Sequence, residues 1–294
     1  MNRDLVGYGA TPPSANWPGG ARTAVQFVVN YEEGAENNVL NGDAGSEAFL
    51  SEMVGAGSHT GMRSMAMESL YEYGSRAGFW RLHRLFTSRG VPVTVFGVAK
   101  AMEMNPAAVD AMLKADWEVA SHGLKWIDYQ YVDEATERAH IEEAIDLHTK
   151  LTGERPLGWY QGRTSPNTAR LVVEEGGFLY DADSYADDLP YYDTRYGKTQ
   201  LIVPYTLDVN DMKIVAYNGF SEGEEFFRYL RDTFDMLHTE GGCMMSIGLH
   251  GRIAGRPGRA LAISRFLDHI LAEDDVWVAR RIDIARHWLK EHPA

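Results

Sequence analysis

Two adjacent carboxylates, Glu32 and Glu33, end an apolar segment that begins at Thr23. The segment is typical of a buried strand, and Gly34 follows the carboxylates directly. Neighbouring residues of a strand point to opposite sides, so we expect one carboxylate to face the interior and the other a loop or a supporting side chain. The end of a buried strand is where α/β sheets carry their chemistry, so the two carboxylates are candidates for different roles in a catalytic site.

Other polar side chains follow apolar segments further along the chain. They are His122, Arg163, Asp181 or Asp183, Asp208 with Asn210 and Asp211, His250, and Arg280, Arg281 and Asp283. Each has a structural interpretation by itself, such as a hydrogen-bonded histidine, a turn residue or an ion pair. The carboxyl ends of parallel strands meet at one face, however, so together these groups predict an active site with acids, bases and a cation.

The elements that would position these groups alternate between strands and helices. Helix signals include the pair Asn105 and Pro106, the segment from Asp133 to Gly153, and Ser221 with Glu224 three residues later. This alternation favours a largely parallel sheet, and about seven such units without a break in composition favour a barrel over an open doubly wound sheet.

The predicted organisation is a single catalytic domain over residues 1–294. It comprises an N-terminal arm (1–22), a barrel (23–288) and a loop insertion at about 35–66 near the mouth of the barrel. The arm is rich in Gly and Pro but carries Tyr8 and Trp17, which need a surface to pack on. We expect arm and insertion to pack against neighbouring subunits of a dimer or tetramer; the alternative is an arm folded back on its own barrel.

The charge balance excludes several classes of partner. The 294 residues include 28 Lys and Arg against 42 Asp and Glu, a formal net charge of -14, which disfavours nucleic acid and anionic membranes. The single cysteine, Cys243, rules out an internal disulfide. With neither a signal peptide nor an apolar run of membrane length in the sequence, the expected location is the cytoplasm.

The order of the candidate groups resembles the polysaccharide deacetylase superfamily, whose members are distorted (β/α) barrels. The resemblance extends from Thr23 to Trp288 and implies an α/β fold, a distorted barrel of about seven strands. The superfamily's first motif, Thr-Phe-Asp-Asp-Gly, corresponds to residues 30–34. Its arginine motif corresponds to Arg163, and its last motif, a strand ending in a catalytic histidine, corresponds to His250.

The second motif departs from the superfamily at one position. Ser121 and His122 match its Ser/Thr-His pair, but Trp126 stands where a second histidine is expected four residues later. In the metal-dependent members, the second carboxylate and both histidines bind zinc, and a tryptophan offers no lone pair for this purpose. The resemblance therefore implies that no metal or other cofactor is required; the alternative is a weakly bound zinc at Glu33 and His122, completed by water or His250.

Longer phrases resemble the metal-independent allantoinases and the cyclic imide hydrolases, among them SHGLKWIDY, ERPLGWYQGRTSPNTAR and GLHGRIAGRPGR. The implied substrate is a small cyclic amide or imide, which is opened by water. The allantoinase pattern has Thr at the position of Gln161 and Cys at that of Gly251, and these differences favour a cyclic imide hydrolase. Allantoinase, converting allantoin to allantoate, is the alternative.

The substrate explains how a metal could be lost. A ring nitrogen flanked by two carbonyls is a better leaving group than that of a sugar acetamide, so the reaction can proceed without a Lewis acid. It still needs a base for water, donors for the oxyanion and an acid for the nitrogen. We expect Glu32 or Glu33 as the base, His250 as the acid and Arg163 as the cation that stabilises charge.

The remaining candidates would orient or bind the substrate. We expect His122 to orient the carboxylate or the substrate, and five residues to contact the ring: Tyr31, Trp126, Trp159, Asp208 and Asn210. Two other classes of function remain open. A metal-dependent polysaccharide or peptidoglycan deacetylase would need the complete metal triad, and a non-catalytic binding protein would not need Glu32, Glu33, Arg163 and His250 together.

Overall fold

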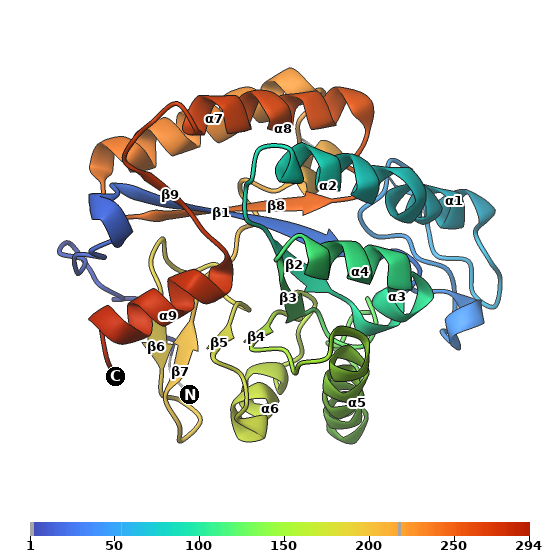
Figure 1. The fold of residues 1–294 in the computed structure, drawn as a ribbon. Coiled ribbons are helices and arrows are strands. Elements are labelled where there is room, and N and C mark those ends of the chain that lie inside the picture. The colour runs from blue at the N-terminus through green and yellow to red at the C-terminus, as the bar shows by residue number, and fades with distance from the viewer. Residues whose placement is uncertain (1–2, 54, 217–218) are drawn as a thin grey trace.

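A curled β-sheet runs through the centre of the molecule, with helices packed around its outer face (Figure 1). The computed structural model describes residues 3–53, 55–216 and 219–294. Within these residues nine strands form the sheet: β1 (Thr23–Tyr31), β2 (Thr94–Gly97), β3 (Glu118–Ser121), β4 (Gly158–Trp159), β5 (Tyr180–Asp181), β6 (Tyr191–Asp193), β7 (Gln200–Ile202), β8 (Met244–His250) and β9 (Val276–Val278).

The strand order is β6-β7-β5-β4-β3-β2-β1-β8, with β9 paired to the start of β1. All pairs are parallel except β6 with β7, which are antiparallel. Among the described residues, β8 is also linked to segments outside the strands, by a bridge from Gly248 to Asn210, which follows β7, and by a hydrogen bond from Met244 N to Asp188 O, which precedes β6. The predicted distorted α/β barrel is confirmed, although the sheet has more strands than the seven expected and β6 was not anticipated.

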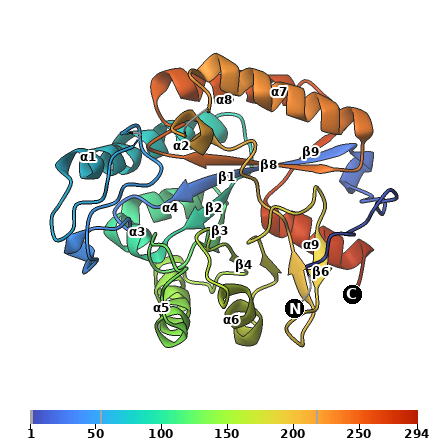
Figure 2. The ribbon, with the colours of Figure 1, turned by 180° about the vertical axis from the view of Figure 1, so that it is seen from behind.

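Nine α-helices alternate with these strands in the described residues, and Figure 2 shows the same arrangement from behind. They are α1 (Met65–Tyr73), α2 (Phe79–Thr87), α3 (Ala99–Met104), α4 (Pro106–Lys114), α5 (Glu134–Thr152), α6 (Thr168–Glu175), α7 (Gly223–Glu240), α8 (Pro257–Ile270) and α9 (Arg281–Glu291). Short turns are η1 (Pro18–Gly20), η2 (Val39–Asn41), η4 (Asp211–Ile214) and a π-helical turn, η3 (Gly74–Gly78), between α1 and α2. Apart from η2, the described residues of the insertion at 35–66 form no helix or strand before α1 begins at Met65.

The side chains of β1 point alternately to the two faces of the sheet, and each face belongs to a different hydrophobic cluster. Phe27 packs outward against the helices, with its ring centroid 5.1 Å from that of Phe86 of α2. Val28 belongs to the cluster inside the curled sheet, together with Phe96 and Tyr205. Even-numbered residues of β1 therefore face the interior and odd-numbered residues face the helices, which sets the directions of the two carboxylates that follow.

Most of the predicted helix signals are confirmed. The Asn105 side chain accepts a hydrogen bond from Ala108 N at the start of α4, and Asp133 accepts one from Thr136 N at the start of α5. The predicted pair of Ser221 and Glu224 is wrong, because the Ser221 hydroxyl and backbone N–H donate to Glu225 instead.

The N-terminal arm packs against its own chain through Tyr8 and Trp17, which is the alternative that the sequence left open for it. Trp17 is buried beside Trp277 and Trp288, and its indole N–H donates to the carbonyls of Gly242 and Cys243. Tyr8 donates from its hydroxyl to Pro190 O. The C-terminal helix supplies the apolar surface that the two aromatic side chains need.

Trp17→Ala is expected to destabilise the protein by about 3–5 kcal/mol, because it leaves a large cavity against α9 and removes the indole hydrogen bonds. The matched arm variant Tyr8→Phe removes a single hydrogen bond and should lower stability by only about 1 kcal/mol. Thermal and denaturant unfolding of both variants would check the difference. Equal, small effects would contradict the structural role of Trp17.

Among the described residues, none of the helices combines the length and apolarity that crossing a bilayer requires.

Candidate active site

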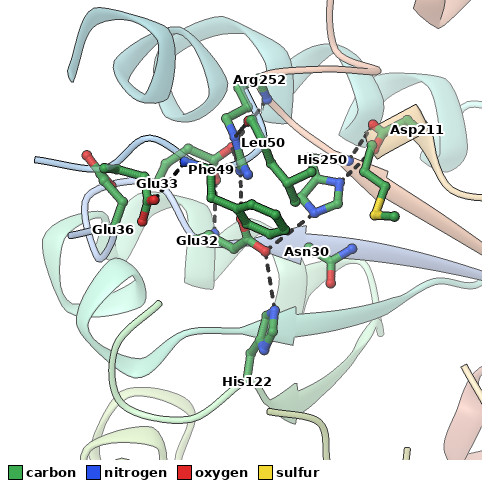
Figure 3. Close-up of polar contacts among 12 residues, drawn as sticks. Asn30, Glu32, Glu33, Glu36, Phe49, Leu50, His122, Asp211, His250 and Arg252 are labelled. Atoms are coloured by element: carbon green, nitrogen blue, oxygen red, sulfur yellow. Dashed lines mark hydrogen bonds and ion pairs between the residues drawn. The ribbon is translucent and has the colours of Figure 1, made fainter. Parts of the chain in front are cut away.

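The Glu32 carboxylate lies between two histidine rings at the carboxyl ends of the strands (Figure 3). Its Oε1 atom is 3.3 Å from His122 Nε2, beyond the end of β3, and 3.4 Å from His250 Nε2, at the end of β8. His122 Nδ1 is 2.9 Å from Tyr160 O, to which it donates, and this contact fixes the ring with Nε2 toward Glu32. The structure thus brings together three of the residues predicted from the strand ends.

His250 is held on its far side by Asp211. One carboxylate oxygen of Asp211 lies 2.6 Å from His250 Nδ1, and the other accepts hydrogen bonds from His250 N at 2.7 Å and Ala254 N at 2.9 Å. Burial lowers the pKa of His250, but the charges of Asp211 and Glu32 outweigh burial and raise it to about 9. His250 therefore carries a proton that it can donate at neutral pH.

Arg252 approaches Glu32 from the opposite side. Its Nη1 atom is 2.7 Å from Glu32 Oε2, and its guanidinium stacks 4.2 Å from the centroid of the Tyr71 ring. Burial raises the pKa of Glu32, but the charges of Arg252 and His250 outweigh this and hold it well below its usual range. Glu32 is therefore a carboxylate that can accept a proton.

Glu33 points outward, as expected for the neighbour of an inward-facing residue. Its two carboxyl oxygens accept hydrogen bonds from Glu32 N at 3.1 Å and Arg252 N at 3.3 Å. It packs so closely on η3 that a Cβ at Gly74 would overlap Glu33 Oε1. Burial raises the pKa of Glu33, so this side chain favours its neutral form more than Glu32 does.

The residues present do not fit a zinc ion. The predicted weak pair, Glu33 and His122, is not brought together, since His122 faces Glu32 instead. The Arg252 guanidinium occupies the other side of Glu32, where it would repel a dication. The Trp126 ring, with its centroid 4.9 Å from that of His122, fills the space of the missing histidine. Among the described residues, His238, Glu273 and Asp275 do form a group with suitable atoms close together, but His238 contacts Thr23 at the opposite end of β1.

Arg163 lies in an outer layer formed with the insertion. Its Nη1 atom is 3.4 Å from Glu47 Oε2, and its guanidinium stacks on Phe49 and Trp126 at 5.0 and 5.4 Å. Figure 3 draws Phe49 and Leu50 of the insertion with Glu32 and the two histidines, and the Leu50 carbonyl accepts a hydrogen bond from Arg252 Nε at 3.5 Å. The residues Glu32, His122, His250 and Arg252 are each 4% exposed or less, and the insertion contacts this buried group at Arg252.

Four predicted substrate-binding residues lie elsewhere. Tyr31, at an odd position of β1, faces the helices, and its hydroxyl contacts Ser75 and Asn105. Trp159 is fully buried in the cluster with Ile141, Leu171 and Phe178. Asp208 accepts a hydrogen bond from the Tyr229 hydroxyl at the surface, and Asn210 caps η4 through Met212 N. Trp126 alone of the predicted ring-contacting residues lies beside the histidines.

The other strand-end candidates have structural roles. Asp183 accepts hydrogen bonds from the backbone of Gln161 and Gly162, and Asp181 accepts one from Asp183 N. Arg280 and Asp283 pair at the start of α9. Arg281 is buried inside the curled sheet, where it donates to Gln26 and Ser246.

Sequence reasoning missed Arg252 and gave Asp211 no role of its own. Asp211 stands in a polar cluster whose other members turned out to be turn and cap residues, and nothing local distinguishes it. Arg252 had a weak signal, since it lies two residues after the candidate acid His250 and side chains two residues apart in an extended segment share a side.

Comparison with known proteins places these motifs in context. The profile of the polysaccharide deacetylase family matches residues 58–177. The chain is 42% identical to a Schizosaccharomyces pombe protein assigned to the polysaccharide deacetylases, over 99% of this chain and 98% of the other. A solved structure from Pseudomonas aeruginosa PAO1, described as a probable polysaccharide deacetylase, is 58% identical, with a TM-score of 0.98 and full coverage of both chains. The structure of PuuE allantoinase is 56% identical, with a TM-score of 0.98, and covers 100% of this chain and 99% of its own.

Proposed function

Because this chain belongs to the polysaccharide deacetylase family and is a hydrolase of carbon–nitrogen bonds other than peptide bonds, we propose that it is an allantoinase. The reaction would open the ring of allantoin with water to give allantoate. The observation that carries the proposal is the similarity to PuuE allantoinase, which extends over the whole chain at 56% identity.

The sequence differences at Gln161 and Gly251, which favoured a cyclic imide hydrolase, carry less weight than this similarity. Gly251 is explained by packing, since a Cβ there would lie 2.9 Å from Gly74 O and 3.0 Å from Glu33 Oε1. A glycine is therefore suited to this position irrespective of the ring that is opened. The comparisons favour allantoinase over the imide hydrolase that the sequence suggested.

The site geometry supports a mechanism with separate base and acid. Glu32, ionised and flanked by both histidines, would take a proton from the attacking water as its oxygen bonds to the ring carbonyl carbon. When the carbon–nitrogen bond breaks, protonated His250 would donate to the departing nitrogen, and Asp211 would stabilise the imidazolium beforehand. His122, fixed by Tyr160 O, would orient the Glu32 carboxylate.

We also propose that no metal takes part. Two features of the chain support this: the Trp126 ring stands beside His122 in place of a ligand, and the Arg252 cation is paired with Glu32. The activated ring provides the chemical reason, because its nitrogen leaves more readily than that of a sugar acetamide.

Incubation of the purified protein with a panel of compounds would test both proposals. We expect allantoin to be opened fastest among allantoin, hydantoin, dihydrouracil, succinimide and a chito-oligomer. The rate should stay within about twofold after treatment with a chelator, because the charges of the site come from protein groups. Elemental analysis of the same sample provides the control. Faster turnover of succinimide would favour the imide hydrolase, and loss of activity that zinc restores would contradict metal independence.

We propose that the protein is a homodimer or homotetramer, because apolar side chains are exposed on the insertion and on the nearby helices α1 and α3. Leu40, Met62 and Met65 are exposed by 68%, 62% and 63%, and Met104 is exposed by 56%. Exposed apolar side chains such as these favour contact with another subunit.

A further inference from the structure

Arg252 is a buried cation with unused hydrogen-bond donors. Its side chain is 2% exposed, and its Nη1 atom is close enough to Glu32 Oε2, at 2.7 Å, for an ion pair. Within the described chain the contacts of Nη1 are ion pairs with the neighbouring carboxylates, and Nη2 has no hydrogen-bond partner. Buried guanidinium donors without acceptors are costly, and this cost is relieved if a ligand supplies an acceptor.

The surrounding structure fixes the direction of this guanidinium. Its flat face lies on the Tyr71 ring at 4.2 Å, its Nε donates to Leu50 O at 3.5 Å, and its backbone N–H donates to Glu33 at 3.3 Å. Because Gly74 has no side chain, Glu33 can lie close enough to accept the hydrogen bond from Arg252 N. Arg252 is therefore oriented before any substrate arrives, which is the condition for effective stabilisation of a developing charge.

Resting on the ring-opening reaction proposed above, we propose that Arg252 binds the oxygen of the carbonyl that water attacks. Water adds its oxygen to the carbonyl carbon and gives a proton to Glu32, and the carbonyl electron pair moves to the oxygen, whose negative charge Arg252 neutralises. The pair then returns as the carbon–nitrogen bond breaks and His250 protonates the nitrogen. The guanidinium thus supplies the charge stabilisation for which the metal-dependent reaction uses a Lewis acid.

The other cation near the site is less suited to this role. Arg163, which the sequence suggested, pairs with Glu47 and stacks on Phe49 in the covering layer. Arg252 is adjacent to the Glu32 carboxylate, where the attacking water would be activated. The role that fits Arg163 is therefore binding of the outer part of the substrate.

Arg252→Ala tests the assignment, with Arg256→Ala as the matched control. Arg256 also stacks on a tyrosine, Tyr73, at 3.6 Å, but lies outside the catalytic group. We expect Arg252→Ala to lower kcat by about 100- to 1000-fold with KM changed less than about threefold, because the lost interaction forms mainly in the transition state. Added guanidinium ion should restore part of the kcat of Arg252→Ala, and Arg256→Ala should stay within about threefold of the unaltered protein.

Arg252→Lys covers the case in which the alanine variant does not fold. It keeps the charge but not the planar pair of donors, so a loss in kcat of about tenfold or more is expected. Turnover within threefold in Arg252→Ala or Arg252→Lys, or an increase in KM alone, would overturn the assignment while leaving the proposed function intact. If the unaltered protein opens none of the rings in the panel, the proposed function fails and the assignment fails with it.

Discussion

Glu32→Gln is expected to lower kcat by about 1000-fold, because general base catalysis typically contributes about 100- to 10,000-fold. Glutamine keeps the size of the side chain and can still contact His122 and His250, but its amide cannot accept the proton of water. Steady-state kinetics on allantoin, with circular dichroism to confirm folding, provides the measurement.

Glu33→Gln is the matched control for this prediction. Glu33 faces the helices, and burial raises its pKa, so an amide resembles the neutral side chain that burial favours there. We expect kcat to remain within about tenfold of the unaltered protein, since Glu33 holds the backbones of Glu32 and Arg252 without reaching the substrate. A larger loss of kcat in Glu33→Gln than in Glu32→Gln would instead assign the base to Glu33 and the supporting role to Glu32.

His250→Ala should lower kcat by about 100- to 10,000-fold, because the ring nitrogen would leave without a proton. The protonated form of His250 is the active one, so kcat/KM of the unaltered protein should fall as the pH rises through the His250 pKa of about 9. Asp211→Asn removes the larger of the two charges that raise this pKa. The alkaline limb of the pH profile should therefore move to lower pH in Asp211→Asn.

The pH profile separates a catalytic role of Asp211 from a purely structural one. A variant that only loses stability would show a lower fraction of active protein with an unchanged alkaline limb. Asp208→Asn is a suitable control, since Asp208 contacts Tyr229 at the surface. An alkaline limb at the same pH in all three proteins would contradict the assignment of His250 as the acid.

The site residues that could be predicted from sequence are those that directly follow a buried strand, because local periodicity shows where such a strand ends. A buried strand followed by two carboxylates already implies that Glu32 and Glu33 point to opposite sides, and the structure has them so. His122 and His250 follow apolar strands in the same way, and parallel strands bring their ends together. The same alternation would have excluded Tyr31, which shares the outward side of β1 with Phe27.

Other features of the fold and the site arise from contacts between segments that are distant in sequence, and local patterns do not show them. Trp159 is indistinguishable in sequence from a pocket aromatic, and only the packing of Phe178 and Leu171 around it shows that it belongs to the core. The strand that was not anticipated, β6, has three residues, too few for any periodicity. Arg252 acquires its position from Tyr71 and Glu33, which lie about 180 and 220 residues earlier in the chain.

The burial of Glu32, His122, His250 and Arg252 affects how fast and how tightly any substrate can bind. These four side chains are almost inaccessible, so a ring can reach them only in the fraction of molecules in which neighbouring segments, such as the insertion that contacts Arg252 through Leu50 O, have moved aside. The apparent dissociation constant is then the intrinsic one divided by that open fraction, and a rare open state weakens binding without altering the chemical step. The open fraction therefore sets both the retention of a bound substrate and the speed of its entry, and it depends in part on a segment that is remote in sequence from both histidines.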